Sequence, residues 1–429
     1  MLVQSLPSSF PVMRAVTFDV SVPRYLLAKS AGRVSDAVLF GGPSGVALRD
    51  VPEPALPGPR WVRLETMLGG ICGSDIANLS YAASPAMEPF GSFPAVIGHE
   101  ILARVVEVGK EVRGLEVGQR VAVDPMLSCD ARGRVHVDWC RSCRSGLAST
   151  CENAGEAGPQ VVGGEPMAPG LTIGYHRSLP GGWGERLVAH ESQIHPVLDE
   201  LPDRTAVLIE PLSIGVHAAL GRPPRAGEPV LVIGSGPIAL ATVWALRANG
   251  FQGEIVAQMK RRHEADLARA LGASAVVAPG TEAREALVGT GAQAYMPIVG
   301  PEVYSGGGFP LIFDCVGSKD SIAQSLHFAS PRARIVVLGC AAQIPRLDLT
   351  FLWARELDVK GFVGYGIEAW REGNPHTYSV TQRLLVESGA PVERMITHTF
   401  PLAQYQDGLR VAANRRKSGS IKVLLDPKA

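Results

Sequence analysis

One stretch restricts the fold of this chain more than any other: an apolar run, a glycine-rich turn and a helical pattern in direct succession. Residues 229–233 read Pro-Val-Leu-Val-Ile, residues 234–239 read Gly-Ser-Gly-Pro-Ile-Ala, and a helical pattern follows over residues 240–248. In such a strand–turn–helix the glycines let the backbone approach a pyrophosphate, which sits at the helix N-terminus. The stretch therefore predicts a dinucleotide-binding unit. The residues predicted to contact the cofactor are Gly234, Gly236, Pro237 and Ile238.

The alternation of strands and helices continues beyond this unit, which predicts a parallel α/β sheet. Further elements are predicted as strands at residues 254–257, 275–278, 311–317 and 334–339, and as a helix at residues 264–271. Residues 281–310 are long and glycine-rich, more loop than a repeating α/β unit requires, and we assign them no role.

The end of the second predicted strand bears on the choice of cofactor. An NAD-binding unit usually carries Asp or Glu there, which binds the ribose hydroxyls. Here residues 258–262 read Gln-Met-Lys-Arg-Arg. Lys260 and Arg261 could pair with a 2′-phosphate that no acid would repel, although the same side chains could simply start a solvated helix. The sequence favours NADP(H) over NAD(H) and leaves both open.

A β-rich domain is predicted before and after the α/β part. Short β-type runs separated by glycine and proline occur from Met13 to about Pro202, and β-type runs return after Trp353. Residues 19–36 interrupt the pattern without a clear period, and we read them as an insertion. The predicted division is a β-rich domain over residues 1–205, a nucleotide-binding domain over 206–357, and the remainder of the β-rich domain over 358–429.

Four of the seven cysteines lie close together in the sequence, within a lobe at about residues 125–155. Two thiolates two residues apart can bind one ion, and four complete a closed tetrahedral zinc site that stabilises its lobe. His136, in the polar loop 130–139, is an alternative ligand, and four incidental thiols are the alternative to any metal. The predicted structural-zinc ligands are Cys129, Cys140, Cys143 and Cys151.

A second set of possible metal ligands lies upstream. Cys72 stands in Gly-Ile-Cys-Gly-Ser-Asp and His99 in Gly-His-Glu, and a thiolate with an imidazole suits Zn²⁺. Asp75 could orient the imidazole, and the Ser74 hydroxyl could relay a proton. Each fragment alone is a weak signal.

Composition excludes several classes of protein. The chain of 429 residues has 41 basic and 41 acidic residues, which gives no support to a nucleic-acid partner. No apolar run approaches the length of a membrane span, and the first dozen residues contain no Lys or Arg, unlike a secretory signal. An odd number of cysteines without an export signal indicates a reducing cytoplasm.

Taken together, these residues resemble the zinc-dependent medium-chain dehydrogenase/reductase family, that of the alcohol dehydrogenases, over most of the chain. The resemblance rests on both donor sets, the glycine-rich turn, residues 357–366 and Glu210-Pro-Leu-Ser, which is most similar to the sorbitol and threonine dehydrogenase branch. It implies a GroES-like catalytic domain split by a Rossmann doubly wound sheet. It also implies a catalytic zinc and hydride exchange between a secondary alcohol, such as a polyol or amino alcohol, and nicotinamide.

The family's site residues can be carried over to matching positions. The resemblance implies Cys72 and His99 as ligands of the catalytic zinc, with Glu100 and Glu210 competing for the remaining protein position. Ser74 would pass the proton, because Ala77 stands where many relatives carry a relay histidine. Two zinc ions per chain, a small alcohol or carbonyl substrate, and a homodimer or homotetramer are further expectations. The eleven-residue step between the first two lobe cysteines departs from the family spacing of three.

Two other functions remain possible from the sequence. One is a zinc-free reductase of enones or quinones with a vestigial donor set, and the other is a non-enzymatic nucleotide-binding protein. Zinc content separates the first from a zinc enzyme, and turnover across an alcohol panel separates the second. The substrate itself is left open among sugar alcohols, amino alcohols, cyclitols and simple alcohols.

Overall fold

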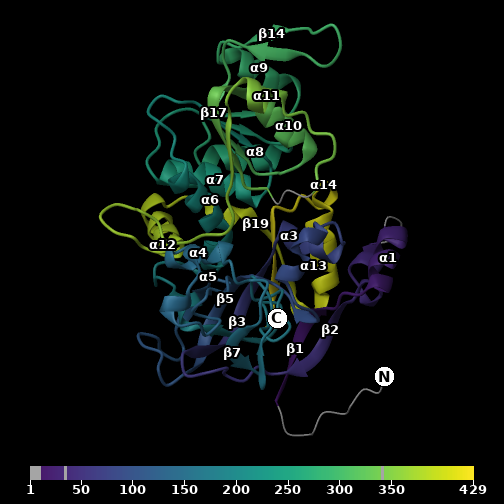
Figure 1. Cartoon of the computed structure of the whole chain (residues 1–429), viewed down its shortest axis with the longest axis vertical. Helices are drawn as coiled ribbons and strands as arrows, with labels where there is room; N and C mark the ends of the chain where they lie inside the picture. The colour runs from purple at the N-terminus through teal and green to yellow at the C-terminus, as the bar shows by residue number, and fades with distance from the viewer. Residues whose placement is uncertain (1–10, 33–35, 340–342) are drawn as a thin grey trace. The chain divides into compact units, whose positions relative to one another are not determined.

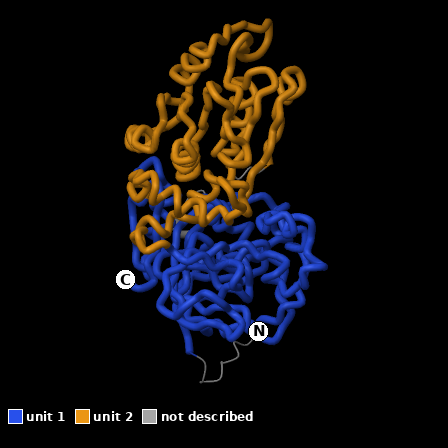
Figure 2. The backbone as a smooth tube through the Cα atoms, turned by 90° about the vertical axis from the view of Figure 1, so that its left-hand side faces the viewer, with its two compact units in different colours: residues 1–197, 396–429 blue, residues 198–395 orange. Residues whose placement is uncertain are grey.

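A computed structural model describes residues 11–32, 36–339 and 343–429. Contacts divide the chain into two compact units, residues 1–197 with 396–429 and residues 198–395 (Figure 2). The domain limits expected from the sequence, 205/206 and 357/358, stay a prediction. Cys340, the seventh cysteine, lies outside the described residues.

Unit 1 contains a seven-stranded sheet in which both ends of the chain take part. Strand β20 pairs with β3, and β19 pairs with β20 in parallel, so the C-terminal segment completes a sheet begun by N-terminal strands. The other pairings in this sheet are antiparallel. Its order is β10 (Ile194–Pro196), β6 (Arg120–Val123), β5 (Glu100–Val108), β3 (Trp61–Ile71), β20 (Lys422–Asp426) and β19 (Ile396–Pro401), with β9 (Arg186–His190) also on β3.

Smaller elements surround that sheet. A three-stranded sheet joins β2 (Val46–Pro52), β1 (Val12–Phe18) and β4 (Ala95–Val96), and β7 (Gly158–Val162) pairs with β8 (Glu165–Met167). The stretch 19–36, for which the sequence showed no period, contains helix α1 (Val22–Ala31). The remaining helices are α2 (Asp36–Leu39), η1 (Gly42–Ser44), α3 (Gly73–Leu79), η2 (Pro85–Phe90), η3 (His136–Asp138), α4 (Arg141–Arg144), η4 (Ala148–Thr150), η5 (Glu191–Gln193), η7 (Leu402–Gln404), α13 (Tyr405–Ala413) and α14 (Arg415–Ser418).

Strand pairing in unit 1 brings the first donor set together. Cys72 directly follows β3 and His99 directly precedes β5, and the register pairs Gly70 with Glu100. The end of one strand and the start of its antiparallel neighbour lie at the same edge of a sheet. The paired strands therefore present the thiol and the imidazole at one edge, although Cys72 and His99 are 27 positions apart in the sequence.

Unit 2 is a parallel six-stranded sheet. Its order is β13 (Ala275–Val277), β12 (Ile255–Gln258), β11 (Val230–Ile233), β16 (Phe309–Asp314), β17 (Ala329–Val337) and β18 (Asp358–Gly361). Counted along the chain this is the order 3-2-1-4-5-6, which is that of the Rossmann fold. The connecting helices are α7 (Pro237–Ala248), α8 (Arg262–Ala270), α9 (Thr281–Gly289), α10 (Lys319–Phe328) and α11 (Thr350–Ala354) (Figure 1).

Two stretches of unit 2 differ from the sequence expectation. Residues 281–310 are not a long loop, because they form α9 and an antiparallel hairpin of β14 (Gln293–Tyr295) and β15 (Val303–Ser305). The β-type run after Trp353 supplies β18, which pairs with β17 in the parallel sheet, and the chain rejoins the sheet of unit 1 only at β19. The other helices of the unit are α5 (Asp203–Ala206), α6 (Ile209–Gly221), α12 (Thr377–Ser388) and η6 (Val392–Met395).

None of the described helices combines the length and the apolar character that a membrane span requires.

Candidate active site and metal centres

The first donor set forms a compact cluster at the edge of the unit 1 sheet. One ligand atom from each of Cys72, His99 and Glu100 lies within 4.8 Å of the others. A thiolate, an imidazole and a carboxylate are the ligand types that zinc takes, and three protein ligands leave a position for water or substrate. The residues present therefore fit a catalytic zinc ion.

Asp75 fixes the orientation of His99. The Nδ1 atom of His99 lies 3.2 Å from Oδ1 of Asp75, while Nε2 lies 3.5 Å from the Ser74 hydroxyl. Asp75 itself accepts hydrogen bonds from the backbone N–H of Cys72 (2.8 Å) and from the hydroxyl of Tyr175. A carboxylate on one ring nitrogen leaves the other to bind a metal, which is the role expected for Asp75.

The same contacts shift the protonation of the pair. Burial alone would lower the pKa of His99, but the Asp75 carboxylate raises that pKa well above its ordinary value. Burial alone would raise the pKa of Asp75, but His99, Tyr175 and the Cys72 backbone lower it. Because zinc binds neutral imidazole, metal binding must displace a proton from His99 and weakens as the pH falls.

Glu100 is already engaged by a lysine that the sequence analysis missed. The Nζ atom of Lys422 lies 2.5 and 2.7 Å from the two Glu100 oxygens, and the two side chains are 2% and 1% exposed. A Cβ atom on Gly70 would lie 1.9 Å from Oε2 of Glu100, so only glycine leaves room for this carboxylate. Lys422 neutralises the charge of Glu100, so a metal ion would have to compete with this lysine for the carboxylate.

Neither Lys422 nor Tyr175 has a local sequence signal. Lys422 reaches the site because β20 pairs with β3 in the register Val423 to Ile71, and Tyr175 lies in a segment without a named strand. Their roles become visible only when strand order and register are known.

Glu210, the other predicted carboxylate, belongs to unit 2. It lies in the first turn of α6, is 5% exposed, and accepts a hydrogen bond from the hydroxyl of Tyr365 at 3.0 Å. Its assignment as a zinc ligand stays a prediction.

The four lobe cysteines form a second, closed cluster. Their sulfur atoms lie within 4.8 Å of one another and all four residues are buried. The Cys129 backbone N–H points to the Cys143 sulfur at 3.3 Å, and the Asn153 amide points to the Cys129 sulfur at 3.2 Å. Hydrogen bonding from Cys143 lowers the pKa of Cys151 to about 5. Donors aimed at sulfur stabilise thiolates, so this cluster fits a tetrahedral zinc without an open position.

His136, the alternative ligand, is not part of this cluster. It is exposed on η3, and its ring centroid lies 4.7 Å from that of Trp139. The inserted loop 130–139 therefore leaves the four cysteines as the donor set.

The glycine-rich turn of unit 2 has the geometry of a phosphate-binding turn. Gly234 follows β11 with φ +142°, and a Cβ atom there would lie 3.2 Å from Cys315 and 3.3 Å from Ala239. Gly236 precedes α7, whose first residues are Pro237 and Ile238. The N–H groups at the start of that helix can therefore face a pyrophosphate.

The cations that follow β12 differ in whether they already have a partner. Gln258 is buried and exchanges two hydrogen bonds with Gln324, while Arg261 donates to the buried Glu264 at 2.5 Å. Lys260 is exposed, its backbone N–H donates to the Ser235 hydroxyl, and its side chain has no ion pair among the described residues. Of the two predicted phosphate partners, Lys260 is the better placed.

Comparison with known families agrees with this geometry. Residues 58–200 match the alcohol dehydrogenase GroES-like domain and residues 237–377 match the zinc-binding dehydrogenase domain, together about two thirds of the chain. The chain belongs to the zinc-dependent medium-chain dehydrogenase/reductase family. The predicted combination of a GroES-like domain with a Rossmann domain is confirmed.

Individual relatives cover nearly the whole chain of this dehydrogenase. L-threonine 3-dehydrogenase of Proteus mirabilis is 27% identical over 387 residues, covering 89% of this chain and 96% of its own. A Saccharomyces cerevisiae protein named as a probable diacetyl reductase forming (R)-acetoin is 28% identical over 397 residues, covering 87% and 86%. A zinc-binding dehydrogenase of Sinorhizobium meliloti 1021, solved with NADP, has a TM-score of 0.70 and 25% identity over 97% and 100% of the chains.

The protein is an oxidoreductase that transfers hydride between a secondary alcohol and a nicotinamide cofactor. Its family uses zinc, which favours the zinc enzyme over the zinc-free reductase and the non-enzymatic binding protein.

Proposed function

We propose that the enzyme acts on a secondary alcohol with a second polar group on the adjacent carbon, at a zinc held by Cys72, His99 and a carboxylate. The observation that carries the metal assignment is the convergence of the Cys72, His99 and Glu100 ligand atoms within 4.8 Å. The substrate class is supported by the relatives, because threonine and acetoin both carry nitrogen or oxygen beside the carbinol carbon.

Each residue has a defined task in this proposal. Zinc, when bound, supplies the Lewis acidity that makes alcohol deprotonation accessible near neutral pH. Asp75 holds His99 in the orientation that presents Nε2, and the Ser74 hydroxyl relays the proton of the substrate hydroxyl outward, taking it up while it passes its own proton on to water. Gly234 and the start of α7 hold the cofactor so that its nicotinamide can accept the hydride.

The carboxylate ligand is proposed to be exchangeable. Lys422 competes with a metal for both oxygens of Glu100, so Glu100 would ligate only when it leaves the lysine. Glu210 remains the alternative, on the resemblance alone. Glu100→Gln should cost more metal if Glu100 is the ligand at rest, and Glu210→Gln should cost more if Glu210 is. Wild-type kinetics in both variants would remove carboxylates from the mechanism.

We further propose a structural zinc at Cys129, Cys140, Cys143 and Cys151, which makes two ions per chain. We also propose that the enzyme is a homo-oligomer. We place it in the cytoplasm because cysteines without disulfide bonds suit a reducing compartment. Elemental analysis of the purified enzyme should give about two zinc ions per chain. A count near zero in active enzyme would refute the metal chemistry.

NADP(H) is the proposed preferred cofactor. Lys260 is available for a 2′-phosphate, and a charge-assisted hydrogen bond of ~1.5 kcal/mol corresponds to roughly tenfold in affinity. Arg261 contributes less than the sequence suggested, because Glu264 already binds it. The test is kcat/KM with both cofactors for wild type and for Lys260→Ala. Preference for NAD(H), unchanged in the variant, would exclude this proposal.

The decisive substrate experiment is a matched panel. Vicinal diols, vicinal amino alcohols, cyclitols, and simple secondary alcohols of the same chain length should be compared by kcat/KM. We expect vicinally substituted alcohols to exceed simple ones by tenfold or more. Equal kcat/KM values across the panel would contradict the proposed substrate class and would indicate a general alcohol dehydrogenase.

A further inference from the structure

The inserted loop 130–139 contains a fully buried arginine in the same lobe as the four cysteines. Arg132 is 0% exposed. Its Nε donates to the carbonyl of Leu127 at 3.3 Å, Nη1 donates to the carbonyl of Glu156 at 3.4 Å, and Nη2 donates to the carbonyl of Gly170. No carboxylate among the described residues forms an ion pair with it.

The neighbouring Arg134 has a carboxylate partner, which Arg132 lacks among the described residues. Arg134 pairs with the exposed carboxylate of Glu156 at 2.8 Å, whereas Arg132 donates only to the backbone carbonyl of that residue. A buried charge is stable only when an opposite charge compensates it. Burial lowers the pKa of Arg132, and the side chains of Cys151, Cys129 and Cys143 act in the opposite direction.

We propose that Arg132 is the counter-cation of the four-cysteine metal site, and that the insertion in the lobe is what brings it there. The inference rests on the structural zinc proposed above. Four thiolates around one divalent ion carry a net charge of minus two, and the guanidinium reduces it to minus one. A buried cation therefore lowers the free energy of the loaded site more than that of the empty one.

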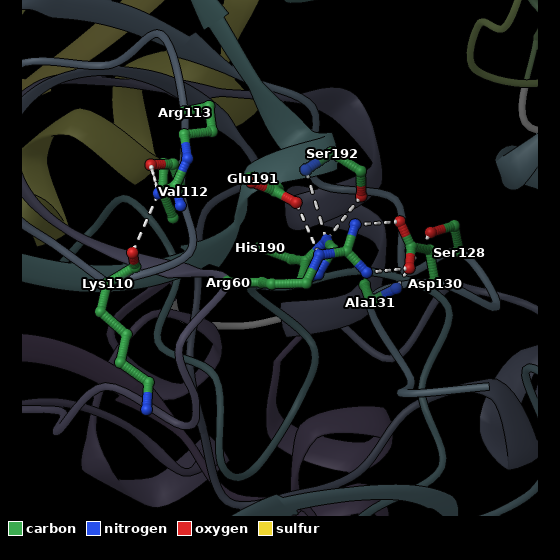
Figure 3. A network of polar contacts seen from close by, with 10 residues as sticks. All are labelled: Arg60, Lys110, Val112, Arg113, Ser128, Asp130, Ala131, His190, Glu191 and Ser192. Atoms are coloured by element: carbon green, nitrogen blue, oxygen red, sulfur yellow. Dashed lines mark hydrogen bonds and ion pairs between the residues drawn. The ribbon is translucent and has the colours of Figure 1, made fainter. Parts of the chain in front are cut away.

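The position of Arg132 is fixed on both sides. Asp130 receives a forked pair of hydrogen bonds from Arg60, at 2.6 and 2.8 Å, and Arg60 also binds Glu191 at 2.6 Å (Figure 3). On the other side, the backbone N–H of Gln160 donates to the Arg132 carbonyl at 2.9 Å. The loop thus keeps the guanidinium buried inside the lobe that contains the four sulfur atoms.

The test is zinc release from the full-length enzyme. We suggest working in a Cys72→Ser background, which leaves only the four-cysteine ion, and following transfer of zinc to a chromogenic chelator. Arg132→Met should release zinc at least tenfold faster, while Arg132→Lys, which keeps the charge, should stay within about threefold. Arg134→Met is the matched control and should stay within twofold. Release from Arg132→Met at the wild-type rate would overturn the inference.

A spectroscopic readout separates charge compensation from packing. With Co²⁺ at the four cysteines, the sulfur-to-metal charge-transfer band should move to lower energy in Arg132→Met and return toward wild type in Arg132→Lys. Removing a nearby positive charge makes the sulfur electrons easier to displace, whereas a packing defect alone need not be rescued by lysine. An unshifted band in Arg132→Met contradicts the proposal. If Arg132→Met does not fold, Arg132→Gln takes its place in both measurements.

A different result is expected if the four cysteines do not bind zinc at all. If Cys140→Ser in the same background leaves the zinc content unchanged, the four-cysteine site does not hold the ion, and both proposals fall. If zinc is lost in Cys140→Ser but its release is indifferent to Arg132, only the role of Arg132 is refuted.

Discussion

The two donor clusters of unit 1 are built in opposite ways. The four-cysteine cluster draws its ligands from residues 129–151 and its sulfur atoms are closed in by nearby backbone and amide donors. The Cys72 and His99 cluster joins the ends of two strands, and its supporting residues Tyr175 and Lys422 come from distant parts of the chain. A locally built site suits a metal that holds a fold, and a site assembled from several strands suits an adjustable reaction centre.

The largest expected effect concerns the assembled cluster. Cys72→Ser should remove one zinc ion and lower turnover by roughly a thousandfold or more, about 4 kcal/mol in the activation free energy. The melting temperature should change little, because this cluster is not needed to close the lobe. Zinc analysis, steady-state kinetics and calorimetry on one preparation test this. Full activity with both ions retained would show that the catalytic assignment is wrong.

Loss of the metal from the four-cysteine lobe should lower stability more than activity. Cys140→Ser should lose the other ion and lower the free energy of unfolding by roughly 4 kcal/mol, the size expected for loss of a structural metal. Activity should fall only in proportion to the folded fraction. Denaturant unfolding with and without a chelator provides the measurement. If Cys140→Ser keeps the wild-type stability and retains the ion, the four-cysteine cluster is not a structural metal site.

The buried ion pair offers a finer test of the assembled cluster. Lys422→Met leaves the Glu100 carboxylate buried without a partner, which typically costs ~3–5 kcal/mol of stability. The loss should be smaller in zinc-loaded enzyme than in chelator-treated enzyme, because the released carboxylate can then bind the ion. Lys428→Met removes an exposed partner of Glu65 and serves as the control, with less than about 1 kcal/mol expected. Equal losses with and without zinc would exclude Glu100 as a ligand.

The smallest effect is expected at Tyr175. Tyr175→Phe removes one hydrogen bond to Asp75, worth ~1.5 kcal/mol or about tenfold in kcat/KM if Asp75 orients His99. Because Tyr175 helps to lower the Asp75 pKa, its loss should also move the acid limb of zinc binding to higher pH. A titration of zinc content against pH measures this. Tyr81→Phe is the matched control, because among the described residues the Tyr81 hydroxyl donates to the Ser44 carbonyl alone.

The sequence by itself determined the features that contiguous residues encode. The strand, glycine turn and helix over 229–248 were predicted correctly, because short-range geometry fixes them. The four lobe cysteines, which are close in the sequence, also lie together in the structure. The convergence of Cys72 with His99 could be expected only through the family resemblance, since nothing local relates the two fragments.

Only the tertiary structure decided the partners that depend on strand order and register. Lys422 reaches Glu100 through the pairing of β20 with β3. Strand β18 joins the parallel sheet, although its sequence does not distinguish it from an exposed strand elsewhere in the chain. In the sequence Arg132 is one charge among several in a polar loop, and only the structure shows that its side chain is fully buried. The physical reason is that hydrophobic period and turn chemistry specify where elements begin and end. Which of them pair is set by the free energy of the whole packed sheet.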